Sequence, residues 1–524
     1  SYRFTTIRDL VANNTPEVFL GTISPAIMRG VRHTKAGFYV QDDWRVRSNL
    51  TLNIGVRYEP MNIPTEVGGR ISTLRNSDDR RLVEGNPMLT KNPSLQNFAP
   101  RLGFAWDIFG DGKTSVRGGY GLFYDMLGPI HYRSHSSLNL PFSIFLTRGA
   151  PPFPDPAEGL VLDDPFAVKT SPSVISDAIE QGGVHQFQLS IQRELFSDLM
   201  VQVNYSGSRG YNLGHLIDAN FAIPQTDANG VFPFWPAGVE RRNPSFSRLR
   251  DFRWDAASFY NALGLEVRKR FNHGFSLQGS YTFSKSIDDA SSTSVADTGG
   301  TPNGATHFPD DIKFDRGLSG FDVRNRLVLN GSWDLPGNNL SGAARHILGG
   351  WTLNGIWTMA TGNHATVQMA FVNTSRSQGS SGDIADPVDR PNLIPGGNNN
   401  PVLHGGRNPD QYFDHTQFQP APPGYLGNLA RGTIENPGIN TIDFSLHKSV
   451  DLGESRRLEF RAEFFNIFNR TNFSQAGTFF GGNIWLYLRL GPEGAPFIPL
   501  SSALKLTTTA TTSRQGQFAL KLHF

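Results

Sequence analysis

The stretch that decides the fold is residues 50–59, which read Leu-Thr-Leu-Asn-Ile-Gly-Val-Arg-Tyr-Glu. One side of this stretch is apolar and consists of Leu50, Leu52, Ile54, Val56 and Tyr58. Polar or small residues occupy the positions between them, which is the two-residue period of a β-strand with one apolar face. The same alternation recurs at 102–108, 275–284, 458–464 and 517–524. Helical spacing of apolar residues is not sustained, so the sequence predicts an all-β chain.

The connections between these segments alternate between very short and very long. Short links such as 46–49 and 109–112 contrast with stretches of roughly 30 to 80 residues, whereas an ordinary loop has about 4–6 residues. A soluble sandwich has no reason to keep every second connection short. A transmembrane β-barrel does, because its turns are short on one side of the membrane and its loops are long on the other. We therefore expect an antiparallel transmembrane β-barrel.

Counting the segments between short and long connections predicts about 13 strands, each near the ~10 residues that a tilted strand needs to cross a membrane. The expected spans are 35–45, 50–59, 99–108, 113–125, 184–194, 199–208, 257–271, 274–287, 321–335, 349–361, 440–450, 456–467 and 515–524. An odd number of strands cannot begin and end on the same side. With a periplasmic C-terminus, residues 1–34 are expected to form an extracellular loop region, and residues 35–524 the barrel portion.

Aromatic residues gather at the predicted strand ends beside the short turns, where ordinary core aromatics would be scattered along the strands. A ring at such a position is half in hydrocarbon and half in water, as in the aromatic girdle of a membrane barrel. The expected girdle residues are Trp44, Trp106, Trp333 and Trp351. The opposite face is too polar for a packed interior, as the alternating residues of 186–192 show, and it indicates a watery or plugged lumen.

Composition excludes several classes of protein. The 48 basic and 46 acidic residues leave a net charge of +2, which gives no electrostatic reason to expect a nucleic-acid partner. Cysteine is absent, which excludes disulfides, thiolate zinc sites and cysteine nucleophiles. No apolar run approaches the ~20 residues of a membrane-spanning helix. Because no catalytic or phosphate-binding motif is present either, we expect neither an enzyme nor a cofactor.

Three sets of residues are weaker site candidates. Charged strand residues are expected to face the lumen, where ordinary ion pairs are the simplest interpretation and contacts with a plug the alternative: Arg57, Glu59, Glu266, Arg268, Glu459, Arg461 and Glu463. Asp383, Asp386 and Asp389 could gather Ca²⁺, although their spacing is not that of an EF-hand and a solvated acidic loop is the favoured interpretation. Ligand specificity is expected in the long loops, with these candidates: Phe232, Phe234, Trp235 and Arg376. Their aromatic rings could stack on sugars or grip peptides, or equally pack the loops together.

Several strings of the chain resemble the C-terminal barrel of TonB-dependent outer-membrane receptors. The resemblance is nearest to the Oar-like group, whose full-length members carry a carboxypeptidase-regulatory-like domain before the plug. The strings are FYVQDDWR at 38–45, LTLNIGVRY at 50–58, SYTFSKSID at 280–288, RAEFFNIFN at 461–469 and QFALKLHF at 517–524. They occur in the right order and extend over nearly the whole chain.

This resemblance implies a 22-stranded barrel, of which the chain would supply roughly strands ten to twenty-two. The plug domain, the TonB-contacting segment and the first strands would lie N-terminal to these residues. Since open sheet edges are costly in lipid, the missing strands are expected from an upstream segment or another chain. The closing strand resembles the signal read by the barrel-assembly machinery, with these residues: Phe518, Leu520, Leu522 and Phe524.

The function implied is uptake of an unidentified extracellular substrate across a bacterial outer membrane. The long loops would be extracellular and the short turns and C-terminus periplasmic. The expected partners are outer-membrane lipid, the assembly machinery, TonB through the absent plug, and the extracellular ligand. Two alternatives remain open. One is a passive or structural outer-membrane barrel with a role in adhesion or secretion, and the other is a soluble all-β carbohydrate-binding protein.

Overall fold

The computed structural model of the protein describes residues 2–4, 7–16, 18–23, 29–128, 139–159, 170–175, 179–236, 238–246, 249–291, 308, 310–370, 390–406, 408–453, 456–474, 483–489, 497–499 and 501–524.

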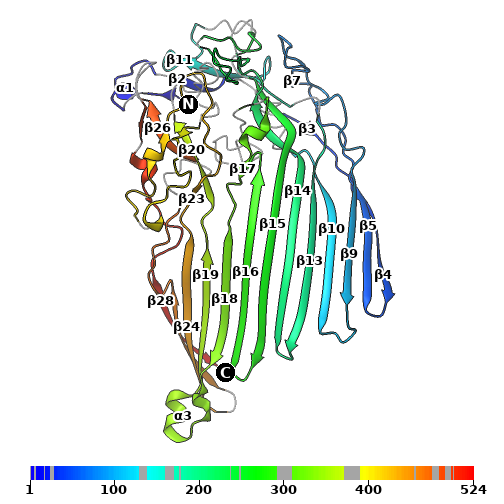
Figure 1. Ribbon diagram of the computed structural model, residues 1–524, viewed down its shortest axis with the longest axis vertical. Coiled ribbons are helices and arrows are strands. Elements are labelled where there is room, and N and C mark those ends of the chain that lie inside the picture. The colour runs from blue at the N-terminus through cyan, green and yellow to red at the C-terminus, as the bar shows by residue number, and fades with distance from the viewer. Residues whose placement is uncertain are drawn as a thin grey trace.

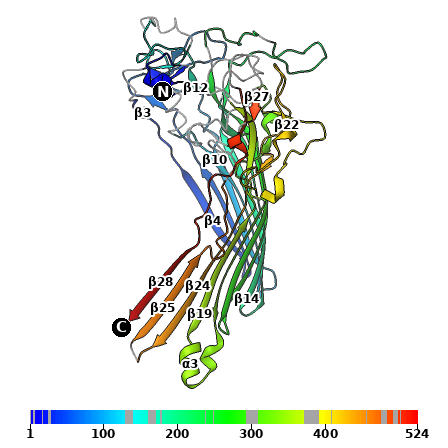
Figure 2. The ribbon, with the colours of Figure 1, turned by 90° about the vertical axis from the view of Figure 1, so that its left-hand side faces the viewer.

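The chain forms one large antiparallel sheet in which thirteen strands follow one another in sequence order. They are β4 (Phe38–Arg47), β5 (Leu50–Tyr58), β9 (Phe98–Asp107), β10 (Thr114–Asp125), β13 (Gly182–Phe196), β14 (Leu199–Asp218), β15 (Arg250–Asn272), β16 (Phe275–Asp288), β18 (Asn325–Asp334), β19 (Trp351–Ala360), β24 (Ile439–Asp451), β25 (Arg457–Phe465) and β28 (Gln515–His523). Figures 1 and 2 show that the sheet curves like part of a barrel wall. The number and order of the predicted strands are confirmed.

Strand register joins the alternating residues into two continuous faces. On the first face Leu52 stands opposite Phe104, and Leu102 stands opposite Tyr120. The same row continues on β13 with Phe187, which stands opposite Tyr120 of β10. On the other face Gln188 stands opposite Ser206. We call the first the apolar face and the second the polar face, and this two-sidedness is the structural form of the two-residue period.

The strands are joined at one end of the sheet by tight turns. His273 and Gly274 both have positive φ, as a two-residue hairpin turn between β15 and β16 requires. The connection from β18 to β19 differs, because it contains the 3₁₀-helix η2 (Pro336–Asn339) and the helix α3 (Gly342–Leu348). Figure 1 shows α3 and the C-terminus at this turn end and the N-terminus at the opposite end.

Strands β14 and β15 extend well beyond their predicted ends at 208 and 257. Both faces of this extension are covered by loops, which is why apolar residues continue on both sides of it. Leu216 and Phe252 belong to one buried cluster and Ile217 to another. The strands β12 (Ser173–Ile175) and β17 (Gly317–Leu318) add short pairings to β15 and β16.

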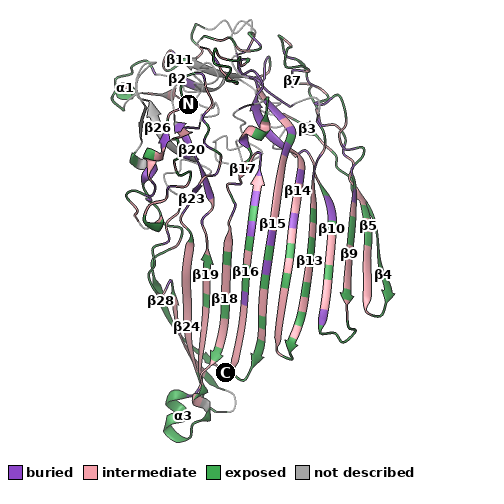
Figure 3. Ribbon diagram, in the orientation of Figure 1, coloured by how far each residue is buried: buried purple, intermediate pink, exposed green. Residues whose placement is uncertain are grey.

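The long loops form small sheets above the strands. Their strands are β1 (Tyr2–Arg3), β2 (Val18–Ile23) and β11 (Ile144–Gly149); β3 (Val31–Arg32) and β6 (Thr65–Glu66); β7 (Ser72–Thr73) and β8 (Val83–Glu84); β21 (Asn392–Leu393) and β22 (Phe418–Gln419); and β20 (His364–Ala370), β23 (Ile434–Glu435), β26 (Asn483–Arg489) and β27 (Phe497–Pro499). The remaining helices are α1 (Ile7–Val11), η1 (Ile312–Asp315), η3 (Leu403–Gly406), η4 (His415–Gln417) and η5 (Ser501–Leu504). Figure 3 shows that buried residues concentrate in this loop region and in the strand ends beneath it.

The sheet ends in two edge strands, β4 and β28, each with one partner among the described residues. All ten residues of β4 are exposed, and so are all residues of β28 except the last. Within the described ranges, no helix is long and apolar enough to cross a membrane.

Candidate functional site

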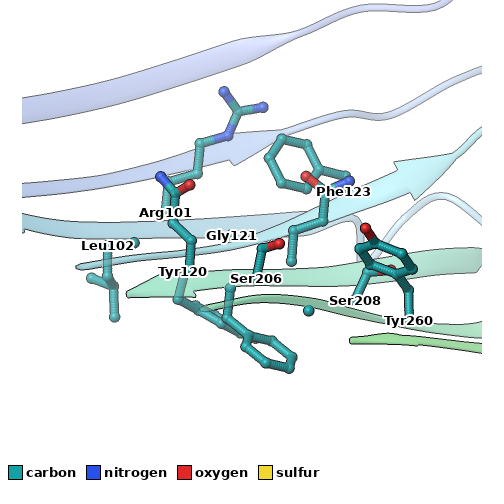
Figure 4. Close-up of a pocket in the computed structure, with 13 residues that line it drawn as sticks. Arg101, Leu102, Tyr120, Gly121, Phe123, Ser206, Ser208 and Tyr260 are labelled. Atoms are coloured by element: carbon teal, nitrogen blue, oxygen red, sulfur yellow. The ribbon is translucent and has the colours of Figure 1, made fainter. Parts of the chain in front are cut away.

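A cleft of about 440 Å³ lies where β9, β10, β13, β14 and β15 run side by side. We call it the polar-face cleft. Its polar lining comprises Arg101, Gln186, Gln188, Ser206, Ser208 and Tyr260. Figure 4 shows Arg101, Phe123 and Tyr260 projecting from one side of the sheet and Leu102 from the other. The cleft is therefore built by strand alternation rather than by a loop.

Glycines on β10 open the floor of the cleft. A Cβ atom on Gly121 would lie 2.8 Å from the ring of Phe123, so only glycine leaves room for this ring to lie back along the strand. The Arg101 guanidinium then stands 4.9 Å from the centre of the Phe123 ring, in cation–π geometry. Arg101 forms no ion pair within 4 Å with any described residue, so its charge remains available to a ligand or to a protein segment in the cleft.

Three pairs of opposite charges on the polar face each join residues that are two positions apart in the sequence. Arg57 contacts Glu59 at 2.7 Å and Arg268 contacts Glu266 at 3.0 Å. Arg461 pairs in the same way with Glu459, which also accepts from His523 at 3.0 Å. For these residues the structure supports the simplest interpretation, namely local ion pairs.

The aromatic loop candidates join two long loops. The backbone N–H of Trp235 donates to the Gly424 carbonyl at 2.8 Å, and the Trp235 indole is 2% exposed and donates to Ala222. The rings of Phe234 and Tyr425 lie 4.8 Å apart. Phe232 is the exposed member of the three. Phe234 and Trp235 therefore pack one loop against the other. We call the contact of Phe234 and Trp235 with Gly424 and Tyr425 the loop joint.

A hydrogen bond closes the loop joint. The Tyr425 hydroxyl donates to Asp227, and together with the backbone N–H of Val231 it lowers the pKa of the Asp227 carboxyl. The same contact raises the pKa of Tyr425. The hydrogen bond is thus strongest while Asp227 is ionised.

The four tryptophans expected to form a girdle lie on the apolar face beside the turn end. Trp106 stands opposite Leu50, Trp44 opposite Leu52 and Trp333 opposite Leu353. Trp351 stands opposite Lys448, whose ammonium lies 5.1 Å from the centre of the Trp351 ring. Lys448 also donates to the carbonyls of α3, at 2.9 Å for His346 and 3.0 Å for Ile347.

The residues of the expected assembly signal lie on the edge strand β28. Leu520 stands opposite Phe460 and Phe518 opposite Ala462. Phe518, Leu520 and Phe524 are 68%, 69% and 91% exposed. Phe524 follows the last paired residue of β28, so it contributes little to the packing of the described chain.

The remaining candidates lie outside the described residues. These are Asp383, Asp386, Asp389 and Arg376. Within the part of the chain that the structure describes, no group of three or more His, Asp or Glu side chains is placed to hold a metal ion. Sequence reasoning missed the polar-face cleft, although the interior glycines of β10 were a signal, because glycine inside a strand often marks a close approach.

Comparison with solved structures gives distant similarities. The outer membrane transporter YddB from Escherichia coli is 10% identical with a TM-score of 0.43, over 94% of this chain and 45% of that one. The siderophore receptor PiuA from Acinetobacter baumannii is 9% identical with a TM-score of 0.44, over 94% and 43%. The pyoverdine outer membrane receptor FpvA from Pseudomonas aeruginosa is 11% identical with a TM-score of 0.42, over 95% and 42%. The chain thus spans less than half the length of these proteins.

A comparison with curated proteins finds none that matches the chain. The family model described as outer membrane beta barrel domain matches residues 8–517. This match covers nearly the whole chain and agrees with the thirteen antiparallel strands and their two faces. The chain belongs to the family of outer membrane beta barrel domains.

Proposed function

We propose that the protein is a receptor of the TonB-dependent type that takes up an extracellular substrate through a plugged barrel, and that it belongs to the Oar-like group. The observation that carries the proposal is the polar face, which the strand register continues from one strand to the next. It lies beneath the loop region in which buried residues concentrate (Figure 3). The sequence resemblance to such receptors supports it. The coupling partner TonB and the plug belong to the proposal through that resemblance alone.

The polar face has the composition of a wetted or plugged wall. The polar-face cleft offers amide and hydroxyl groups together with one arginine outside any described ion pair. Such groups bind by hydrogen bonds and can exchange partners at small cost, as a transport path or a removable plug requires. Elsewhere on the face, Arg57, Arg268 and Arg461 are each paired with a glutamate.

Residues 1–34 and the other long loops would be extracellular in this proposal, and Phe232 and Arg376 remain candidates for ligand contact. Asp383, Asp386 and Asp389 remain a candidate Ca²⁺ site. The four tryptophans at the turn end would form the periplasmic aromatic girdle, because rings on a lipid-facing surface favour the membrane interface. The edge strands β4 and β28 would pair with further strands that close the barrel.

The experiment compares cells that produce the protein with cells that lack it. Uptake of labelled ferric siderophores, copper, oligosaccharides and peptides is measured with and without a protonophore. The proposal predicts that uptake of one class requires the protein and is abolished by the protonophore, and that the double variant Arg101→Gln/Tyr260→Phe lowers it. Arg457→Gln at the turn end is the matched control, because its side chain is 61% exposed and distant from the cleft.

A passive or structural barrel is the second candidate function. The loop joint favours it, because it gives the loop layer a fixed surface that suits adhesion. Uptake that needs the protein but survives the protonophore would establish a passive barrel. Absence of protein-dependent uptake, together with loss of cell attachment on deletion, would establish an adhesive one.

A further inference from the structure

Three cations gather on the apolar face near the loop end of the sheet. The guanidinium of Arg316 lies 4.4 Å from the centre of the Phe259 ring, and that of Arg209 lies 5.1 Å from the same centre. Arg209 also reaches from β14 to the neighbouring β15, where it donates to the Asn261 side chain at 3.2 Å. Lys285 stands directly opposite Asn261 on β16. The three charges therefore share one patch, centred on Phe259 and Asn261.

Strand alternation places this patch on the outside of the sheet. Phe259 and Asn261 follow the same period as Leu263 and Leu265, which are 52% and 43% exposed on the apolar face. In a membrane barrel the apolar face meets lipid. The cations thus point toward lipid and away from the polar face.

The height of the patch matches a lipid headgroup layer. Lys285 lies ten positions beyond Phe275, which stands opposite the interfacial Trp333 at the turn end. A tilted strand crosses the hydrocarbon layer in about 9–11 residues, so Lys285 lies at the boundary of that layer opposite the turn end. Polar aromatic side chains mark that boundary, since the Tyr205 hydroxyl donates to Asn261 at 2.7 Å and the Tyr281 hydroxyl to Asn325 at 2.6 Å.

The three cations require a counter-charge that the described chain does not supply within contact distance. Arg209, Lys285 and Arg316 form no ion pair within 4 Å with any described residue. The charge of Arg316 acts on the Asp289 carboxyl, but this carboxyl is buried and accepts a hydrogen bond from the Ala257 backbone. Gathering like charges at a partly desolvated surface costs free energy unless an anion binds there.

We propose that Arg209, Lys285 and Arg316 bind the phosphate group of a lipid in the extracellular leaflet. Guanidinium groups bind phosphate oxygens through paired, charge-assisted hydrogen bonds, and a lysine adds a mobile point charge. The patch is continuous with the lipid-facing surface, so acyl chains attached to that phosphate would lie against Leu263 and Leu265. A soluble phosphate would gain no such contact.

The test uses lipid A, a bisphosphorylated lipid, in vesicles of phosphatidylcholine. The protein is reconstituted, extracted in mild detergent and washed, and retained lipid A is measured per chain. The triple variant Arg209→Gln/Lys285→Gln/Arg316→Gln is expected to retain at least about tenfold less lipid A per chain than the unchanged protein. The matched control Arg117→Gln/Arg326→Gln/Lys521→Gln removes three cations from the polar face and is expected to retain it fully.

Three outcomes would overturn the proposal. They are equal retention by the triple variant, equal retention of dephosphorylated lipid A, and complete displacement by inorganic phosphate. If the triple variant fails to reach the folded, heat-modifiable form, Lys285→Glu takes its place, because Lys285 is exposed. The charge-preserving variant Arg209→Lys/Arg316→Lys then separates charge from packing, and it is expected to retain most of the lipid A.

Discussion

The Tyr425 hydroxyl donates a hydrogen bond to the Asp227 carboxylate at 2.5 Å, although the two residues are 198 positions apart in the sequence. This bond joins the loop between β14 and β15 to the loop that leads into β24. The Phe234 ring packs against the same tyrosine at an interplanar angle of 36°, so Tyr425 provides both the apolar and the polar part of the loop joint. Fixing two long loops in this way reduces the conformational freedom of the layer above the barrel.

The loop joint is predicted to open in acid. The Tyr425 hydroxyl and the backbone N–H groups lower the folded-state pKa of Asp227, so their stabilisation is present above the ordinary aspartate pKa and is lost as the pH falls through the folded value. Limited proteolysis of the segment 224–236 should therefore accelerate several-fold in that acidic range. The measurement is the cleavage rate across a pH series.

Tyr425→Phe is expected to keep the ring contact with Phe234 and to remove the hydrogen bond. Cleavage should then be faster near neutral pH, and the acid midpoint should move up toward the ordinary aspartate value. The matched control is Tyr281→Phe, which removes a tyrosine hydrogen bond on β16 far from this joint. An unchanged midpoint in Tyr425→Phe would show that the hydroxyl does not hold Asp227.

The buried ion pair between Arg390 and Asp315 is expected to be important for the local stability of the loop layer. The two side chains are 2% and 4% exposed and lie 2.8 Å apart. Asp315→Asn leaves the Arg390 charge buried with a weaker partner, so local stability should fall by about 3–5 kcal/mol. Hydrogen exchange of the backbone amides at 311–318 measures this loss.

The exposed pair Arg457–Asp451 provides the control. Its side chains are 61% and 78% exposed at a distance of 3.3 Å, so Asp451→Asn should change local stability by no more than about 1 kcal/mol. The double variant Asp315→Leu/Arg390→Met should recover much of the loss, because it removes both buried charges. If Asp315→Asn and Asp451→Asn lowered local stability by similarly small amounts, burial would not be what makes the Arg390–Asp315 pair important.

Much of the large sheet could be predicted from the sequence. The segment 50–59 alternates without interruption, and the structure places β5 at Leu50–Tyr58. The ends of β14 and β15 could not be predicted, because an apolar residue covered by a loop has the same local pattern as one that meets lipid. The burial of Leu216 and Ile217 on opposite faces depends on loops that are distant in the sequence.

The candidate site was harder to predict, because it too depends on contacts between segments that are distant in the sequence. Aromatic residues in a loop can serve a ligand or another loop, and the contact between Trp235 and Gly424 joins segments that lie far apart in the sequence. The polar-face cleft depends on register across five strands, which no single segment encodes. The cation patch around Phe259 likewise combines residues from β14, β16 and the segment that follows η1.

Deletion of Phe524 is predicted to impair assembly without destabilising the folded protein. Phe524 is 91% exposed and follows the last paired residue of β28, so its removal should change stability by less than about 0.5 kcal/mol. If it is part of a signal read by strand addition, the folded fraction in cells should fall severalfold. Refolding in detergent measures stability, and heat-modifiable migration of outer-membrane extracts measures assembly.

Phe468→Ala is the control for this deletion, since Phe468 is 74% exposed but lies outside the terminal strand. It should leave the folded fraction in cells unchanged. Normal assembly of the shortened chain would show that Phe524 is not part of an assembly signal. An equal fall of the folded fraction with Phe468→Ala would show the same.

The apolar face is expected to meet lipid, and the polar face to border enclosed water. Because the chain has no cysteine, single cysteines at each position of 186–191 on β13 can carry a nitroxide label. In vesicles, labels at Phe187, Leu189 and Ile191 are expected to be highly accessible to oxygen. Labels at Gln186, Gln188 and Ser190 are expected to be highly accessible to a water-soluble nickel chelate. Uniform accessibility along the strand, or the opposite alternation, would show that the apolar face does not meet lipid.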